Sequence, residues 1–212
     1  MDTDGLIKAL SADTGPWLAF VGRVLLAALV LAIVAAAIVF AVTIGPRPDI
    51  AVAAETVRFL LKFVVTALLA ATAFSALSAL SLPQGVSRRT LIGLTAAPVL
   101  LLAAIAAELA TVPSSEWSAR LIGTNSLACT TLIPLMGIAP LALFIAALRY
   151  GAPSRPTLAG AVAGLAAGGI ASALYAAHCT DDSPLFVATW YTLAIAILTV
   201  AGALAGRVFA RW

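Results

Sequence analysis

Two cysteines and a single histidine are the residues of this sequence best suited to chemistry. Cys129 stands alone, whereas Cys179 directly follows His178 and precedes Asp181 and Asp182. Two thiols can form a disulfide in an oxidising compartment, and two thiolates with an imidazole can bind a soft cation such as zinc, cadmium or Cu(I). Each cysteine could instead be a small apolar packing residue. Which reading holds depends on the elements that position them.

The composition identifies those elements as membrane spans. Hydrophobic residues make up 63% of the 212 residues and charged residues 10%, and the mean hydropathy is +1.11. Soluble domains carry about 25% charged residues, so a water-soluble monomer is excluded, and so is a disordered chain. The net charge of +3 is too small for a nucleic-acid-binding face, and no direct nucleic-acid contact is expected. We therefore predict a polytopic membrane protein.

Six charge-free runs predict the spans. Each has at least 18 residues, the length that a helix needs to cross a bilayer. They lie between Arg23 and Arg47, Lys62 and Arg88, Arg89 and Glu108, Arg120 and Arg149, Arg155 and Asp181, and Asp182 and Arg207. The prediction is an all-α fold of six transmembrane helices over residues 21–212, preceded by a cytoplasmic tail over residues 1–20.

The basic residues predict the orientation. With both termini in the cytoplasm, eight of the twelve Lys and Arg residues face inward, as the positive-inside rule requires. The four on the outer side are Arg47, Arg58, Lys62 and Arg120. The fourth span then enters from outside with Cys129, and the fifth exits there with Cys179. The two thiols are therefore expected at equal depth on antiparallel neighbouring helices, facing the oxidising compartment. We interpret Cys129, Cys179 and His178 as a redox or signal-sensing group, with transient binding of a soft metal ion as a second hypothesis.

Enzymatic chemistry and ion transport have little support in the sequence. One histidine cannot provide bis-histidine haem ligation, and a membrane thiol oxidase would need a C-x-x-C pair. Glu108 is the ionisable residue nearest to a span, and it is expected at the outer interface. We expect no cofactor and no catalytic residue. The alternative is a small membrane transporter or channel subunit whose cysteines are purely structural.

The N-terminal tail has the pattern of a short amphipathic helix. Thr3 or Asp4 can cap it, Leu6, Ile7 and Leu10 share one face, and Gly15-Pro16 is expected to end it before Trp17. Such a short helix gains order in a partner's groove. Interfacial helices favour basic polar faces, so the acidic residues, Asp13 among them, favour a cytoplasmic protein partner over an inert membrane-surface helix. The predicted partner-binding residues are Thr3, Asp4, Leu6, Ile7, Leu10 and Asp13.

Glycines recur at four-residue spacing in the last two spans. This G-x-x-x-G spacing lets helix backbones approach closely in a membrane. The residues expected to pack helices in this way are Gly160, Gly164, Gly168, Gly202 and Gly206.

Several segments resemble one family, the NrsF-type membrane anti-sigma factors. The resemblance is carried by residues 3–13, Arg47-Pro48-Asp49, residues 58–62 and 151–156, and most densely by residues 175–179, 182–186 and 190–191. It implies a non-enzymatic protein of the bacterial inner membrane whose N-terminal tail holds an extracytoplasmic-function sigma factor. It also implies that the two cysteines respond to oxidative or heavy-metal stress.

Overall fold

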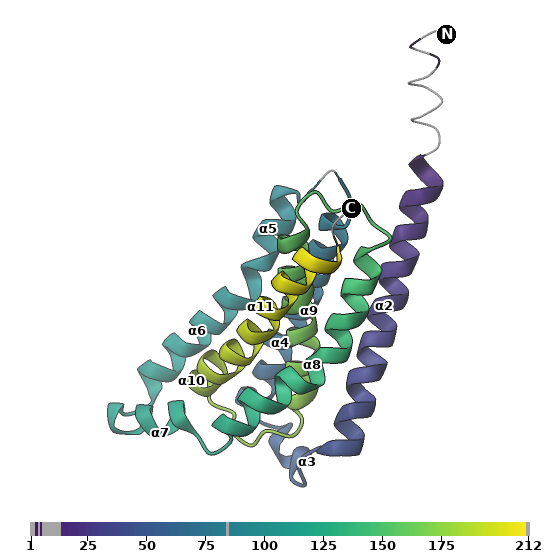
Figure 1. Cartoon of the computed structure of the whole chain (residues 1–212). Helices are drawn as coiled ribbons and strands as arrows, with labels where there is room; N and C mark the ends of the chain where they lie inside the picture. Colours follow the sequence, from purple (N-terminus) through teal and green to yellow (C-terminus); the bar gives the residue numbers. More distant parts are fainter. Residues whose placement is uncertain (1–2, 4, 6–13, 84, 211–212) are drawn as a thin grey trace.

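The structure is a computed structural model that describes residues 3, 5, 14–83 and 85–210. It is all-helical, and six long apolar helices could each cross a membrane, which confirms the predicted fold class (Figure 1). These six are α2 (Thr14–Thr43), α4 (Val57–Leu80), α5 with α6 (Arg88–Leu94, Ala96–Thr111), α8 (Ser126–Leu148), α9 (Pro156–Tyr175), and α10, the π-helical turn η2 and α11 (Pro184–Phe186, Val187–Tyr191, Thr192–Phe209). Short elements α3 (Ile50–Ala53), η1 (Ser114–Glu116) and α7 (Trp117–Ile122) join them at one end.

Local signals set where several of these helices begin. The Thr56 hydroxyl accepts a hydrogen bond from Phe59 N at 3.3 Å at the start of α4, and the Ser87 hydroxyl accepts one from Thr90 N at 3.2 Å at the start of α5. Side-chain oxygens at this position satisfy amide groups that have no partner within the helix. Pro156 begins α9, where its missing N–H costs nothing.

The first long helix starts earlier than the sequence predicts. Helix α2 begins at Thr14 and runs through Gly15 and Pro16, where we expected a break before Trp17. Among the predicted tail residues, Thr3 is helical and exposed. The others, Asp4, Leu6, Ile7, Leu10 and Asp13, lie outside the described residues.

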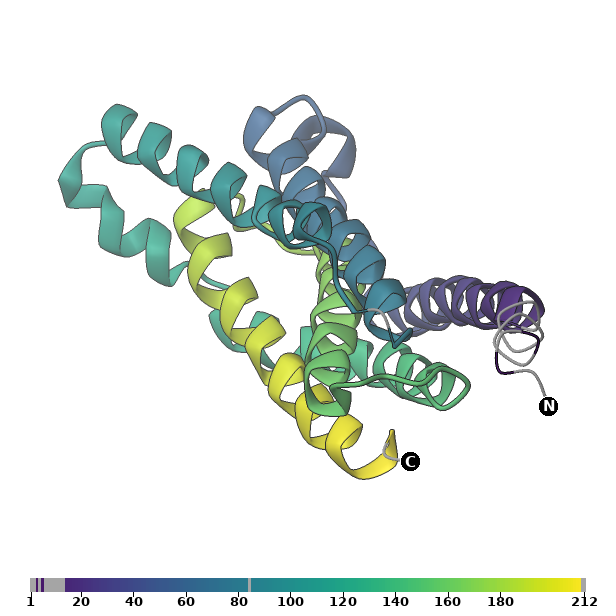
Figure 2. The same cartoon turned by 90° about the horizontal axis from the view of Figure 1, so that it is seen from above.

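Helix α9 is the centre of the bundle. It packs against α11, α4, α8 and α2, and most of its side chains are buried. Helix α6 is peripheral: α4, α5 and α10 are its main contacts, and it stands apart from α11 in the view from above (Figure 2). The outward side chains are apolar, as Leu26, Val30 and Val34 on α2 illustrate, and such a surface suits a lipid environment. Long-range contacts therefore converge on α9 and on the loops at its ends.

Close backbone contact between α9 and α11 occurs at the predicted glycines. A Cβ atom at Gly160 would meet the Gly202 carbonyl oxygen, and one at Gly164 would meet the Leu198 carbonyl oxygen. Gly206 likewise lies against α9 backbone. Gly168 differs, because its added Cβ would lie 3.1 Å from the side chain of Ile195. Small residues thus bring these two helices into backbone contact, as in other membrane bundles.

Candidate functional site

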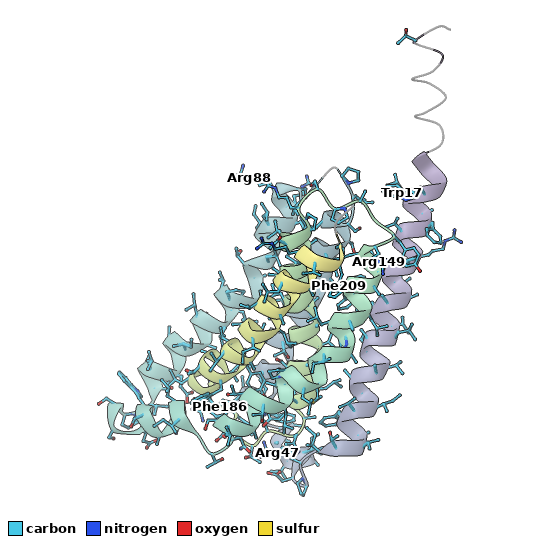
Figure 3. All side chains as sticks on the ribbon, in the orientation of Figure 1. Trp17, Arg47, Arg88, Arg149, Phe186 and Phe209 are labelled. Atoms are coloured by element: carbon cyan, nitrogen blue, oxygen red, sulfur yellow. The ribbon has the colours of Figure 1, made fainter. Side chains whose placement is uncertain are left out.

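The two ends of the bundle differ sharply in charge. One, here called the carboxylate-rich end, carries α3, α7, α10 and every Asp and Glu of the described residues. These are Asp49, Glu55, Glu108, Glu116, Asp181 and Asp182. The opposite, arginine-rich end has six arginines and no carboxylate among the described residues. They are Arg23, Arg88, Arg89, Arg149, Arg155 and Arg207. Figure 3 labels Arg47 at the first end and Arg88 and Arg149 at the second.

Both cysteines lie at the carboxylate-rich end, in one buried cluster. Cys129 is in the first turn of α8, and Cys179 is in the loop between α9 and α10. Each has an exposed fraction of 0%, and both thiols are free. The buried cluster also holds Ile133, Met136, Ala171, Tyr175, Ala176, Phe186, Val187, Tyr191 and Ala194. The sequence placed the two thiols at one end on neighbouring helices, and the structure brings them together there.

Asp181 ties the start of α8 to the loop that carries Cys179. Its Oδ2 atom accepts hydrogen bonds from Thr124 N at 3.0 Å, Asn125 N at 2.8 Å and Asn125 Nδ2 at 2.9 Å. Cys129 N in turn donates to Asn125 O at 2.8 Å. A carboxylate that accepts three N–H groups is held firmly. The Asp181 side chain therefore holds the start of α8 and the Cys179 loop together.

Two cations hold the Cys179 loop from the other side. Lys62 Nζ donates to the Cys179 carbonyl oxygen at 2.6 Å, and Arg47 Nη1 reaches the same oxygen at 3.4 Å. Both cations also form ion pairs with Asp182. Arg47 N donates to Ala177 O at 3.0 Å. The loop is thus attached to the connection between α2 and α3 and to the body of α4.

Lys62 is the functional candidate that sequence reasoning missed. We predicted it at the outer end of the second span, as one of four basic residues there. Instead α4 begins at Val57, so Lys62 lies inside the helix with a side-chain exposure of 1%. Its Nζ lies 4.9 Å from the centre of the Phe59 ring, a favourable cation–π position. The capping residue Thr56 was the available signal, because it moves the start of the helix ahead of the lysine.

His178 does not join the thiols as a ligand set. Its Nδ1 atom is 3.0 Å from Gly45 O, and its ring packs at 5.9 Å from the Tyr175 ring. Across the part of the chain that the structure describes, no group of three or more His, Cys, Asp or Glu side chains could hold a metal ion. His178 thus anchors the loop to the end of α2.

The charges around the loop also shift proton affinities. A hydrogen bond from the Cys129 thiol and the nearby charge of Lys62 lower the pKa of Cys179, although burial opposes the shift. A hydrogen bond from Arg47 lowers the pKa of Asp49, which is at the surface. The hydrogen bonds of Arg47 to Asp49 and to Asp182 raise the pKa of Arg47 in turn. The anionic form of Cys179 is therefore favoured over that of an ordinary buried thiol.

Two tyrosines complete the surroundings of the thiols. Tyr175 and Tyr191 are fully buried, their rings meet edge to face at 5.9 Å, and neither hydroxyl has a hydrogen-bond partner among the described residues. Tyr191 ends the π-helical turn η2, a rare irregularity that often marks functional sites. Both hydroxyls lie close to the thiols, Tyr175 beside Cys129 and Tyr191 beside Cys179.

A second charge network lies beside the first. Glu108 lies one turn before the end of α6, and neighbouring side chains bury it. It pairs with Arg58 at 2.9 Å and Arg120 at 3.0 Å, and these two partners compensate its burial. A cavity of about 800 Å³ opens next to this network, and its lining includes the Cys179 loop at Asp181 and Asp182. The cavity provides a route for small solutes to that loop.

Comparison with known proteins identifies the family. Residues 10–212 match the family described as NrsF, negative regulator of sigma F. The chain belongs to the NrsF family. It is 35% identical over 215 residues to the "Anti-sigma-F factor NrsF" of Caulobacter vibrioides (strain NA1000 / CB15N), which covers the full length of both chains. It is also 35% identical over 116 residues to the "Probable anti-sigma-F factor NrsF" of Azospira oryzae, which covers 54% of each. No solved structure matches.

Membership of the NrsF family confirms the resemblance seen in the sequence. The family consists of membrane negative regulators of sigma F, so the protein is a non-enzymatic regulator of transcription. The six helices long and apolar enough to span a bilayer agree with a multi-pass membrane protein. Neither the alternative of a transporter or channel subunit nor that of a thiol oxidoreductase fits this assignment.

Proposed function

We propose that this protein is an anti-sigma factor of the bacterial inner membrane with both termini in the cytoplasm. Its N-terminal tail sequesters an extracytoplasmic-function sigma factor, and a change at Cys129 and Cys179 on the periplasmic side releases it. The observation that carries the proposal is the gathering of both thiols in one buried cluster at the start of α8. The start of α8 lies at the end of the bundle opposite the start of α2 (Figure 1).

Charge asymmetry supports this orientation. The arginine-rich end holds six arginines without a carboxylate among the residues described, whereas basic and acidic groups pair with one another at the other end. Cytoplasmic loops are enriched in Lys and Arg, so the arginine-rich end is the cytoplasmic one. The start of α2 and the end of α11 both lie at that end (Figure 1). A fluorescent protein fused to the C-terminus should therefore mature and emit in the cytoplasm.

The tail is the proposed sigma-factor-binding element. Its apolar residues Leu6, Ile7 and Leu10 would lie in a groove of the sigma factor, and Thr3, Asp4 and Asp13 would flank them. Replacing the three apolar residues by Asp should release the sigma factor without a stress signal, because charged groups cannot occupy an apolar groove without a large desolvation cost. Co-purification of sigma factor with the membrane fraction measures this. Retention of the sigma factor at the wild-type level would remove the tail from the proposal.

The sensing step has two chemical forms. In one, a two-electron oxidant in the periplasm takes two electrons and two protons from the thiols, and a Cys129–Cys179 disulfide forms. In the other, both thiolates bind a soft cation and release two protons to water. The cavity reaches the Cys179 loop at Asp181 and Asp182, whereas both thiols are fully buried, so either form of sensing requires this loop to open. Mass spectrometry of the protein after exposure to hydrogen peroxide or to cadmium distinguishes them, since one form loses two hydrogens and the other gains a metal.

The contacts of α8 suggest how the signal reaches the tail. Cys129 lies in the first turn of α8, and α8 packs along α2, the helix that follows the tail. A tighter link between Cys129 and Cys179 would draw the start of α8 toward the α9–α10 loop and change its contact with α2. Such coupling requires two packing arrangements whose balance depends on the state of the thiols.

A further inference from the structure

A groove between α8 and α11 is unrelated to the cysteine site. It extends along both helices to the arginine-rich end and has a volume of about 630 Å³. This volume is in the range of small-molecule sites, about 300–1,000 Å³. Its walls are apolar except at one end, where Arg149 lines it beside Phe209. Figure 3 labels both residues at the same end of the bundle.

Alanines produce the groove. Ala142 and Ala146 are one helical turn apart on α8, and Ala201 and Ala205 are one turn apart on α11. Larger side chains at these positions would fill the space between the two helices. The lining on α8 runs from Pro134 to Arg149, a distance of about 22 Å at about 1.5 Å per residue. One leaflet of a bilayer has a hydrocarbon depth of about 15 Å, so the groove accommodates a chain of leaflet length.

The end of the groove is suited to an anion. Arg149 is exposed and forms no ion pair among the residues described. That entire end has no carboxylate in the described part of the chain. Guanidinium groups bind phosphate by two parallel hydrogen bonds. Basic pockets between transmembrane helices are known to bind anionic headgroups.

We propose that this groove binds one anionic phospholipid, with an acyl chain between α8 and α11 and its phosphate at Arg149. A transmembrane helix of a partner or a second copy fits less well. A helix with its side chains is about 10 Å across, so a 22 Å length occupies on the order of 1,700 Å³. A partner helix would therefore insert only some of its side chains, whereas an extended acyl chain is narrow enough to fill the groove along its length. The lipid would seal the gap between the two helices in the leaflet of the arginine-rich end.

The test is native mass spectrometry of the full-length protein in detergent, with phosphatidylglycerol or phosphatidylcholine of identical acyl chains. The wild type should retain one phosphatidylglycerol in preference to phosphatidylcholine. Arg149→Gln should weaken phosphatidylglycerol binding about fivefold, the effect of one basic residue near a headgroup, and leave phosphatidylcholine unchanged. Ala142→Leu and, separately, Ala201→Leu should reduce binding of both lipids, because leucine occupies the groove.

Matched variants control for nonspecific effects. Arg88→Gln removes an exposed arginine from the same end but outside the groove, and Ala103→Leu enlarges an exposed alanine on α6. Both should bind lipid like the wild type. Equal retention of the two lipids by the wild type would overturn the proposal, as would an Arg88→Gln effect equal to that of Arg149→Gln. Unchanged lipid binding in both leucine variants, or a wild-type dimer that they dissociate, would also overturn it.

Discussion

Lys62 offers the sharpest physical test of the loop architecture. Its ammonium group is buried inside α4, donates to the Cys179 carbonyl oxygen at 2.6 Å and pairs with Asp182. Lys62→Met keeps the apolar stem and removes these contacts. A hydrogen bond to a charged group contributes about 1.5–3 kcal/mol, and Asp182 keeps Arg47 as a partner at 3.0 Å. We therefore expect Lys62→Met to lower the free energy of unfolding by about 2 kcal/mol.

The opposite deletion should cost more. Asp182→Leu leaves the buried ammonium of Lys62 without a carboxylate, and breaking a buried pair in this way typically costs about 3–5 kcal/mol. In the double variant the buried Lys62 ammonium is gone as well, so no buried charge is left without a partner, and its loss should fall short of the sum of the two single losses by at least about 1 kcal/mol. Reversible unfolding by SDS in mixed micelles, followed by circular dichroism, measures all four proteins. Additive losses, or a greater loss from Lys62→Met than from Asp182→Leu, would refute this reasoning.

Other perturbations test the remaining contacts. Gly164→Val should destabilise the protein by at least about 2 kcal/mol in the same unfolding assay, since its side chain would meet α11 backbone at Leu198. Gly168→Ala should cost less, under about 1 kcal/mol, because its Cβ would lie no nearer than 3.1 Å to any atom of Ile195. Glu108→Gln should cost under about 2 kcal/mol, because Arg58 is 45% exposed and Arg120 keeps Glu116; a larger loss would mean that water cannot replace the carboxylate. Because the charge of Lys62 lowers the pKa of Cys179, Lys62→Met should move disulfide formation by hydrogen peroxide to higher pH, and an unchanged pH midpoint in a mass-spectrometric time course would contradict that role.

The sequence allowed the spans to be predicted because charge is excluded from the middle of a bilayer. The gathering of the two cysteines at one end followed from the same logic, since Cys129 lies in the first turn of α8 and Cys179 follows the antiparallel α9. The glycine spacing predicted close helix packing without naming the partner helices, and Gly160 and Gly202 meet between α9 and α11. Each inference needed only the local sequence and the apolar character of the bilayer.

Lys62 and Glu108 show where this logic stops. Both were treated as boundaries of apolar runs, yet both lie inside helices and are buried. A buried charge is tolerated when paired, and the partners come from distant segments: Lys62 binds a carbonyl oxygen 117 residues away. The role of Asp181, which binds the backbone just before α8 from 56 residues away, was not predictable for the same reason. Single-sequence patterns do not encode which distant loop supplies a partner.

Release of the sigma factor from membranes in response to an oxidant or to cadmium tests the central claim most directly. The account predicts that wild-type protein loses co-purifying sigma factor on exposure and that Cys129→Ser with Cys179→Ser retains it. Met136→Leu, a volume-conserving change of a buried, non-thiol sulfur in the same cluster, should respond like the wild type. Release that proceeds at the wild-type level in the double serine variant would contradict the account.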